Sequence, residues 1–266
     1  MEKNKNETEL EGHLLFTDGS SLGNPGPGGF GVVLILAGAR VMEIGGSAKH
    51  TTNNRMELLA LIEGLRRMEN ESGDLTIFTD SKYVHKGATE WASGWKRRDW
   101  KTMTKTDVGN RDLWEVALPL LEDRKKFGHT SWKHVPGHSG IAGNERCDAI
   151  ATGFAFVEQS GGELPELYEG DLADYAIDIL NISINEEALE KRREGKARAK
   201  IKAYSYVSRV AGKVIVHKTW AECEAHVKGK RGVQFQKVAS KEEEIALVKK
   251  WGGSKNFESK KFEWDK

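Results

Sequence analysis

Along the first 157 residues, short β-rich runs are separated first by turns and then by helical segments. Three runs, starting at Leu14, Phe30 and Val41, are separated by turns rich in glycine and proline. Two later runs cover Leu75–Thr79 and Thr130–Val135. A three-strand meander followed by strands that alternate with helices predicts a mixed five-stranded sheet flanked by helices, an α/β fold.

Apolar positions at helical spacing predict three helices in the same part of the chain. The first carries an apolar stripe from Met56 to Leu65, and the second lies around Leu113–Lys125. The third starts near Asn144, after a glycine-rich loop at Pro136–Gly143. A stretch rich in tryptophan and basic residues, Trp91–Lys105, precedes the second helix.

The second half of the chain changes character. Residues 158–195 have no strong β pattern and are interpreted mainly as a tether, in which Leu172–Leu180 could form a short helix. From Ala203 onward the pattern reads β-β-α-β-α and predicts a small α+β domain. We therefore expect a disordered leader at 1–11, an α/β domain at 12–157, a linker at 158–200, the α+β domain at 201–251 and a tail at 252–266.

The formal net charge of +1 hides a strong asymmetry between segments. The net charge is −1 over residues 1–157, −10 over 158–190 and +10 over 196–266. Acidic and basic blocks in succession predict a linker and a C-terminal domain that binds a polyanion.

Composition indicates where in the cell the protein is expected. The longest apolar run, Val32–Ala37, is far shorter than the ~18 residues of a membrane helix, so no membrane association is expected. Two cysteines cannot form a disulfide framework, which indicates a reducing, cytoplasmic location.

Four acidic residues stand at positions suited to a metal site: Asp18, Glu57, Asp80 and Asp148. Asp18 and Asp80 end strands that can be neighbours in the sheet, and helices can bring the other two to that edge. Such carboxylates would repel one another without a cation. Oxygen-only ligands favour Mg²⁺, with Mn²⁺ as a substitute, and two ions ~3.5–4 Å apart would serve in-line phosphodiester hydrolysis. Taken singly, each acid can instead be a helix cap or a surface charge.

Four segments in this order resemble the motifs of type 1 ribonuclease H. They are Phe16–Ser20 with the glycine-rich turn Gly23–Gly29 behind it, Thr51–Leu58, Thr79–Tyr83 and Gly137–Asp148. The resemblance covers about residues 12–157. It implies a ribonuclease H-like fold and a metal-dependent endonuclease that cuts the RNA strand of RNA–DNA hybrids, leaving 5′-phosphate and 3′-hydroxyl ends.

The resemblance also implies roles for individual residues. Asp18, Glu57, Asp80 and Asp148 would be the catalytic, metal-binding carboxylates, and Glu57 would accept a hydrogen bond from a ribose 2′-hydroxyl. His138 would assist proton transfer or product release. By spacing alone, a loop histidine is more often simply solvated.

Substrate contacts are implied at two places. One set of residues would contact the RNA strand and a phosphate of the DNA strand: Gly23, Asn24, Thr52, Asn53 and Asn54. A second set forms a basic protrusion that would bind the DNA strand: Trp91, Lys96, Arg97 and Arg98. Alternatively, the tryptophans belong to the core and the charges to a solvated face. The chain departs from the family at Lys82, usually glutamine, and at His50 and Gly94, which alter the phosphate pocket.

The segment Tyr204–Val248 resembles the hybrid-binding, viroplasmin-like domain, which usually precedes a ribonuclease H domain and here follows one. The resemblance implies that Trp220 and Phe235 pack against the DNA strand and that Lys237 meets a phosphate. Gln236 replaces a second lysine. Double-stranded RNA is a further possible ligand, and Trp220 and Phe235 can alternatively be core residues.

Two other functions are compatible with parts of the sequence. Another nuclease or integrase on the same fold is disfavoured by the Asn53–Glu57 motif and the basic protrusion. A hybrid-binding protein without catalysis is disfavoured because all four carboxylates are present. The sequence therefore predicts a monomeric ribonuclease H with an accessory hybrid-binding domain.

Overall fold

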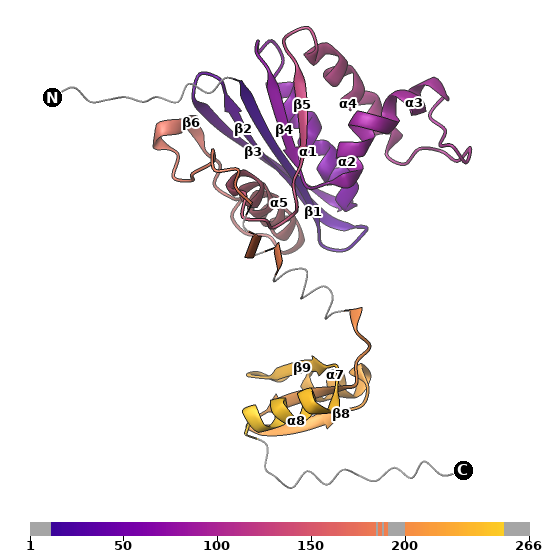
Figure 1. Ribbon diagram of the computed structural model, residues 1–266, viewed down its shortest axis with the longest axis vertical. Helices are drawn as coiled ribbons and strands as arrows, with labels where there is room; N and C mark the ends of the chain where they lie inside the picture. The colour runs from indigo at the N-terminus through magenta and orange to yellow at the C-terminus, as the bar shows by residue number, and fades with distance from the viewer. Residues whose placement is uncertain (1–11, 185, 188, 191–199, 253–266) are drawn as a thin grey trace, which may run out of the picture. The chain divides into compact units, whose positions relative to one another are not determined.

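The computed structural model describes residues 12–184, 186–187, 189–190 and 200–252. The chain divides into two compact units, residues 1–189 and 190–266, each with its own sheet (Figure 1). The expected leader, most of the expected tail and residues 191–199 of the expected linker lie outside the described residues. In the described part of the chain, no helix has the length and apolar character needed to cross a membrane.

The first unit is built on a mixed sheet of six strands in the order β5-β4-β1-β2-β3-β6. Its strands are β1 (His13–Ser21), β2 (Gly26–Leu36), β3 (Arg40–Thr51), β4 (Leu75–Thr79), β5 (Thr130–His134) and β6 (Glu169–Asp171). β1, β2 and β3 form an antiparallel meander, and β4 and β5 lie parallel to β1. The α/β fold expected from the sequence is confirmed, with one strand more than expected.

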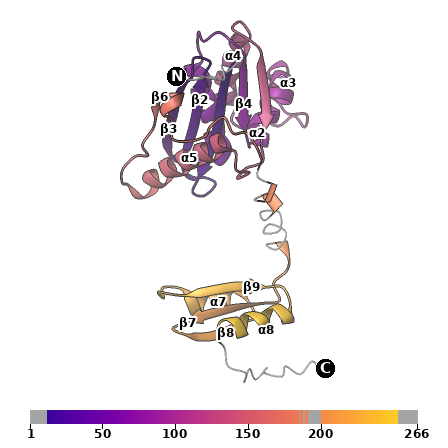
Figure 2. The same cartoon turned by 60° about the vertical axis from the view of Figure 1, so that its left-hand side comes forward.

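Helices cover both faces of this sheet (Figures 1 and 2). They are α1 (Asn53–Arg67), α2 (Lys82–Lys86), the π-helix η1 (Gly87–Trp91), α3 (Ala92–Arg97), α4 (Arg111–Arg124) and α5 (Ala142–Ser160). Leu15 faces the core under α1 and α4, whereas its neighbour Phe16 faces the core under α5. Because both faces are buried, the central strand β2 is a continuous apolar run rather than an alternating one.

The expected linker begins later than the sequence suggested. α5 continues to Ser160, and residues 165–179 then return along the first unit, where β6 pairs with the outer edge of β3. Tyr168, Tyr175 and Ile179 pack into the α5 core. We call residues 165–179 the edge strap. The short helix that the sequence allowed at Leu172–Leu180 does not form, and only Leu172–Asp174 is a 3-10 turn.

A buried ion pair joins the edge strap to the sheet and to α5. The Glu43 carboxylate on β3 has a fully buried side chain and accepts two hydrogen bonds from Arg146 on α5, at 2.6 and 2.7 Å. The Tyr175 hydroxyl and the Tyr168 main-chain N–H also donate to it. Burial raises the pKa of Glu43, but the bonds from Arg146 and the tyrosines outweigh it and leave the pKa below its usual value.

The second unit is a three-stranded antiparallel sheet in the order β8-β7-β9, with one helix against each face. Its elements are β7 (Ser205–Val210), β8 (Lys213–His217), α7 (Trp220–Val227), β9 (Gln234–Val238) and α8 (Lys241–Lys250). Val207 on one face packs with Leu247 of α8, whereas Ser208 on the other face bonds to His226 of α7. Thr219 and Glu222 cap α7 reciprocally. The small α+β domain expected from the sequence is confirmed as a fold.

Replacing Arg146 by leucine should destabilise the first unit, because it leaves the Glu43 carboxylate buried without its cation. We expect a loss of about 3 kcal/mol in the free energy of unfolding, the low end for a broken buried pair, since Arg146 is partly exposed. Urea unfolding of the full chain would measure it. Arg40→Ala, which removes the exposed pair Arg40–Glu169, serves as the control and should cost at most about 1 kcal/mol. Equal losses in the two variants would contradict the structural role of the buried pair.

Candidate active site

Two of the acidic residues meet because their strands are adjacent and parallel. Thr17 of β1 pairs with Thr79 of β4, so Asp18 and Asp80 both follow at the same edge of the sheet. Asp18 is buried, with 8% of its surface exposed, and its Oδ1 accepts a 2.7 Å hydrogen bond from the main-chain N–H of Gly19.

Helix α1 brings the third carboxylate to this edge by crossing β1 at Gly19. A Cβ at Gly19 would lie 2.2 Å from the main-chain nitrogen of Glu57, so only glycine permits this approach of helix to strand. The Asn53 side-chain amide donates to Glu57 Oε1 at 2.7 Å, and the Ser81 hydroxyl donates to Oε2. Ser81 also caps α2 by accepting from the N–H of Val84. The Glu57 carboxylate is thus held in one orientation.

The three carboxylates form a group that suits a cation. Asp18, Glu57 and Asp80 offer ligand oxygens that all lie within 4.8 Å of one another. Burial, and then the charge of Asp80, raises the pKa of Asp18 to about 8. Burial likewise raises the pKa of Glu57 to about 7, against the hydrogen bonds from Ser81 and Asn53. Bringing a hard cation to this group would relieve both the desolvation and the mutual repulsion of the carboxylates.

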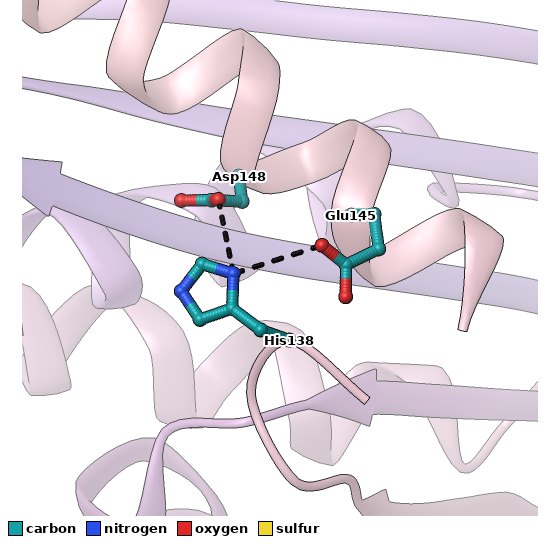
Figure 3. Close-up of side chains that lie close together, drawn as sticks. All are labelled: His138, Glu145 and Asp148. Atoms are coloured by element: carbon teal, nitrogen blue, oxygen red, sulfur yellow. Dashed lines mark ion pairs between the residues drawn. The ribbon is translucent and has the colours of Figure 1, made fainter. Parts of the chain in front are cut away.

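The fourth carboxylate belongs to a second, adjacent group on α5 and the loop before it (Figure 3). His138 Nδ1 lies 3.6 Å from Asp148 Oδ2 and 3.6 Å from Glu145 Oε2. The His138 side chain is 57% exposed, and its backbone is left-handed at φ 52°. Thr152 connects this group with β1, since its hydroxyl lies 3.5 Å from that of Ser20 and 3.4 Å from Asp148 Oδ1.

Glu145 is a site residue that sequence reasoning did not single out. It precedes Asp148 by one turn of α5, so both side chains share a helix face. Its Oε1 accepts from the main-chain N–H of Gly140, which ties the histidine loop to the helix. The only signal in the sequence was this three-residue spacing inside the fourth motif.

The expected RNA-strand contacts lie in two neighbouring segments. Gly23 and Asn24 are exposed in the turn between β1 and β2, and Asn54 is exposed in the first turn of α1. Thr52 and Asn53 are half-buried, and the Asn53 amide already serves Glu57.

The expected protrusion separates into a packed aromatic part and a solvated basic part. Trp95 is buried against Trp114, and Trp91 is half-buried with its ring centroid 5.7 Å from that of Trp95. The basic side chains Lys96, Arg97 and Arg98 are exposed; Lys96 approaches Glu122 at 3.4 Å and Arg98 Nε approaches a main-chain carbonyl at 3.3 Å. Cations with this exposure remain accessible to a polyanion.

In the second unit, the expected contact residues Trp220 and Phe235 form an exposed aromatic cluster with the half-buried Tyr206. Trp220 and Phe235 are 42% and 50% exposed, and their ring centroids lie 5.4 Å apart. Tyr206 lies 5.6 Å from Trp220. Lys237 donates to the main-chain carbonyl of Ile201 at 2.7 Å.

A mixed sheet that gathers buried carboxylates at the ends of its central parallel strands defines a nuclease of the ribonuclease H fold. Residues 11–155 match the family model for RNase H. The chain therefore belongs to the ribonuclease H family, whose members are metal-dependent hydrolases of phosphodiester bonds.

Known relatives agree over the same region. A ribonuclease H of Cyanothece sp. is 48% identical over 154 residues, covering 58% of this chain and 92% of that protein. A ribonuclease H of Syntrophotalea carbinolica is 50% identical over 137 residues, covering 52% of this chain and 86% of that protein. Among solved structures, LC9-RNase H1, described as a type 1 RNase H with the type 2 active-site motif, is 31% identical with a TM-score of 0.50, covering 62% of this chain and 80% of that one. The family model ends at residue 155 and does not reach the second unit.

Asp18→Asn should stabilise the metal-free protein at alkaline pH. The folded state holds a proton on Asp18 up to pH about 8, whereas the unfolded chain releases it near 3.8, so the free energy of unfolding falls as the pH rises between these values. The variant has no carboxyl group at position 18, so its free energy of unfolding lacks this dependence on pH. Thermal unfolding in EDTA should show a gain over wild type that grows from pH 5 to pH 8, at roughly 2–4 °C for each kcal/mol.

Added Mg²⁺ should make wild type unfold at a higher temperature than Asp18→Asn. Binding of the ion to the folded state stabilises only the protein with intact ligands. Asp171→Asn, an exposed acid on β6, is the control and should follow wild type throughout. A pH-independent difference between Asp18→Asn and wild type would contradict the electrostatic account.

Proposed function

We propose that this ribonuclease H hydrolyses the RNA strand of RNA–DNA hybrids at the site formed by Asp18, Glu57, Asp80 and Asp148, leaving 5′-phosphate and 3′-hydroxyl ends. The observation that carries the proposal is the group of three carboxylates, of which Asp18 and Glu57 are buried and Asp80 is half-buried, beside a fourth on α5, in a chain of this family. Carboxylates with pKa values raised by burial and mutual repulsion are typical of a site completed by a cation.

The donor set is all oxygen and strongly anionic, which fits Mg²⁺ first and Mn²⁺ as a substitute. Asp18, Glu57 and Asp80 would hold one ion, and Asp148 would share in holding a second with the first group. When bound, such a pair of ions supplies charge neutralisation at the scissile phosphate and activation of the attacking water.

The protein's own residues then orient the substrate and handle its protons. Glu57, fixed by Asn53 and Ser81, presents a carboxylate that can accept the hydrogen bond of a ribose 2′-hydroxyl, the group that separates RNA from DNA. His138, exposed and within 3.6 Å of Asp148, is placed to take up or deliver a proton near the cleaved bond.

Residues outside the carboxylate site would distinguish the RNA strand from the DNA strand. Gly23, Asn24 and Asn54 are exposed for contact with the RNA backbone, with Thr52 and Asn53 beside them. Lys96, Arg97 and Arg98 would meet phosphates of the DNA strand, with Trp91 against its sugars.

The second unit acts as an accessory binding domain in this proposal. Its exposed aromatic cluster, Tyr206, Trp220 and Phe235, offers flat apolar faces to the sugars or bases of a duplex, and Lys237 stands next to it on β9. The net charge of +10 over residues 196–266 adds attraction that does not depend on sequence. Double-stranded RNA would bind through the same face.

End-labelled RNA–DNA, RNA–RNA and DNA–DNA duplexes of one sequence test the activity. With Mg²⁺, only the RNA strand of the hybrid should be cut, and Asp80→Asn should abolish cleavage while hybrid binding stays near wild type, because an amide is a poor ligand for a hard cation. Asp123→Asn, on the exposed surface of α4, is the matched control and should cleave normally. Normal turnover by Asp80→Asn would remove Asp80 from the proposed ligands.

Deleting residues 196–266 should weaken hybrid binding but spare chemistry at saturating substrate, because all four carboxylates lie in the first unit. The full chain should show the steeper salt dependence, since the deleted segment carries +10. Trp220→Ala should reproduce part of the loss, roughly 1–3 kcal/mol. Dissociation constants at two salt concentrations measure both effects. Equal affinities and equal salt slopes would show that the second unit is not a nucleic-acid domain.

A further inference from the structure

The second unit contains an open cleft that is separate from its aromatic cluster. It has a volume of about 970 Å³ and lies between the turn that joins β7 to β8 and the loop that joins α7 to β9. Arg209 and Gly212 line it from the first side, and Lys230, Arg231, Gly232 and Gln234 from the second. We call it the basic cleft.

All the charged side chains that line the basic cleft are positive. Arg209, Lys230 and Arg231 are exposed cations, and none of the residues that line the cleft is acidic. Within the described residues, these three side chains make no ion pair with a carboxylate. Three cations facing one hollow repel one another, and an anion in the hollow would relieve this repulsion.

The main chain is open to a ligand at both walls. Gly212 has a left-handed backbone at φ 81° and Gly232 at φ 65°, and a Cβ built on either glycine meets nothing within 4 Å. Main-chain atoms at such turns are therefore exposed beside the cations, an arrangement that suits an oxyanion.

The basic cleft adjoins the aromatic cluster at one end of β9. Gln234, which lines the cleft, pairs with Arg209 on β7, and the next residue, Phe235, pairs with Ser208. Neighbouring residues of a strand are about 3.3 Å apart, and their side chains point to opposite faces of the sheet. Arg209 therefore points away from the face that carries Phe235, and a duplex on that face reaches the cleft at the end of the sheet, where the loop from α7 to β9 carries Lys230 and Arg231.

We propose that the basic cleft binds a backbone phosphate of the duplex that the aromatic cluster contacts, with Arg209, Lys230 and Arg231 as its ligands. The inference rests on the proposed nucleic-acid role of the second unit and adds a defined phosphate site to it. The site is blind to base sequence, and it adds one ionic contact to the binding of the hybrid.

The test compares hybrid binding by the full chain and two double variants in EDTA, which prevents cleavage. Lys230→Gln/Arg231→Gln removes two charges from the cleft, and Lys249→Gln/Lys250→Gln removes two exposed charges from the last turn of α8 as the matched control. The cleft variant should bind more weakly than the control. Its salt slope should be lower by about 0.9, the value for one phosphate contact, so that its deficit against wild type shrinks roughly threefold to fourfold from 50 to 200 mM salt.

A duplex with single methylphosphonate linkages locates the contact. Neutralising one particular phosphate should weaken binding by wild type and the control but leave the cleft variant unaffected. The alternative is that the cleft binds free phosphate. In that case, inorganic phosphate at constant ionic strength will perturb the NMR signals of Gly232 and Val233, and the cleft substitutions will not change the affinity for the hybrid. That result overturns the proposal.

Trp220→Ala distinguishes a failure of the phosphate site from a failure of the nucleic-acid role of the second unit. If Trp220→Ala weakens binding but the cleft variant matches the Lys249→Gln/Lys250→Gln control, the accessory domain stands and the phosphate site is refuted. If neither Trp220→Ala nor the cleft variant differs from wild type, the second unit does not bind the hybrid and both proposals fail. Thermal unfolding of the two double variants should match wild type, since the substituted lysine and arginine side chains are exposed.

Discussion

Carboxylates of like charge do not come together unless the fold holds them there, and this constraint organises the first unit. Asp18 is buried beside Asp80 and Glu57, and the cost of that placement appears in the raised pKa of Asp18. The parallel register of β1 and β4 fixes two of these residues, and the contact of α1 with Gly19 fixes the third. Each of these features depends on the packed cores on both faces of the sheet, which supply the stabilisation that the acidic site lacks.

The hydrogen bonds around the site hold its residues to different degrees. Glu57 is held by two donors from different elements, so its oxygens have fixed directions before any ligand arrives. His138 and Asp148 are more exposed and sit beside a left-handed loop. In the proposed function, the fixed carboxylate of Glu57 would recognise the substrate and the exposed His138 would transfer a proton.

Much of the fold and part of the site followed from the sequence, for physical reasons. Asp18 and Asp80 could be expected at one edge because strand ends in an α/β sheet gather there. The register of β1 with β4 joins residues 62 positions apart, so only the structure shows that the two strands are neighbours. Glu43 could not be recognised, because its partner Arg146 is 103 residues away and nothing in a strand marks one acid as buried. β6 has three residues and lies in an acidic stretch without a β period, so periodicity could not find it. In the second unit, the charge balance predicted a polyanion ligand, but the cleft forms from two turns that only the tertiary structure brings together.

The edge strap has a consequence for where the catalytic unit ends. The family model stops at residue 155, yet the outer edge of β3 is paired by β6 and the buried carboxylate of Glu43 is completed by Tyr168 and Tyr175. A chain cut at the end of the family match would leave Arg40–Met42 at the outer edge of β3 unpaired, and open strand edges can pair with other molecules. It would also loosen the surroundings of Arg146, two positions before Asp148 on α5. The folded first unit therefore extends past the end of the family match, and the edge strap is part of its structure.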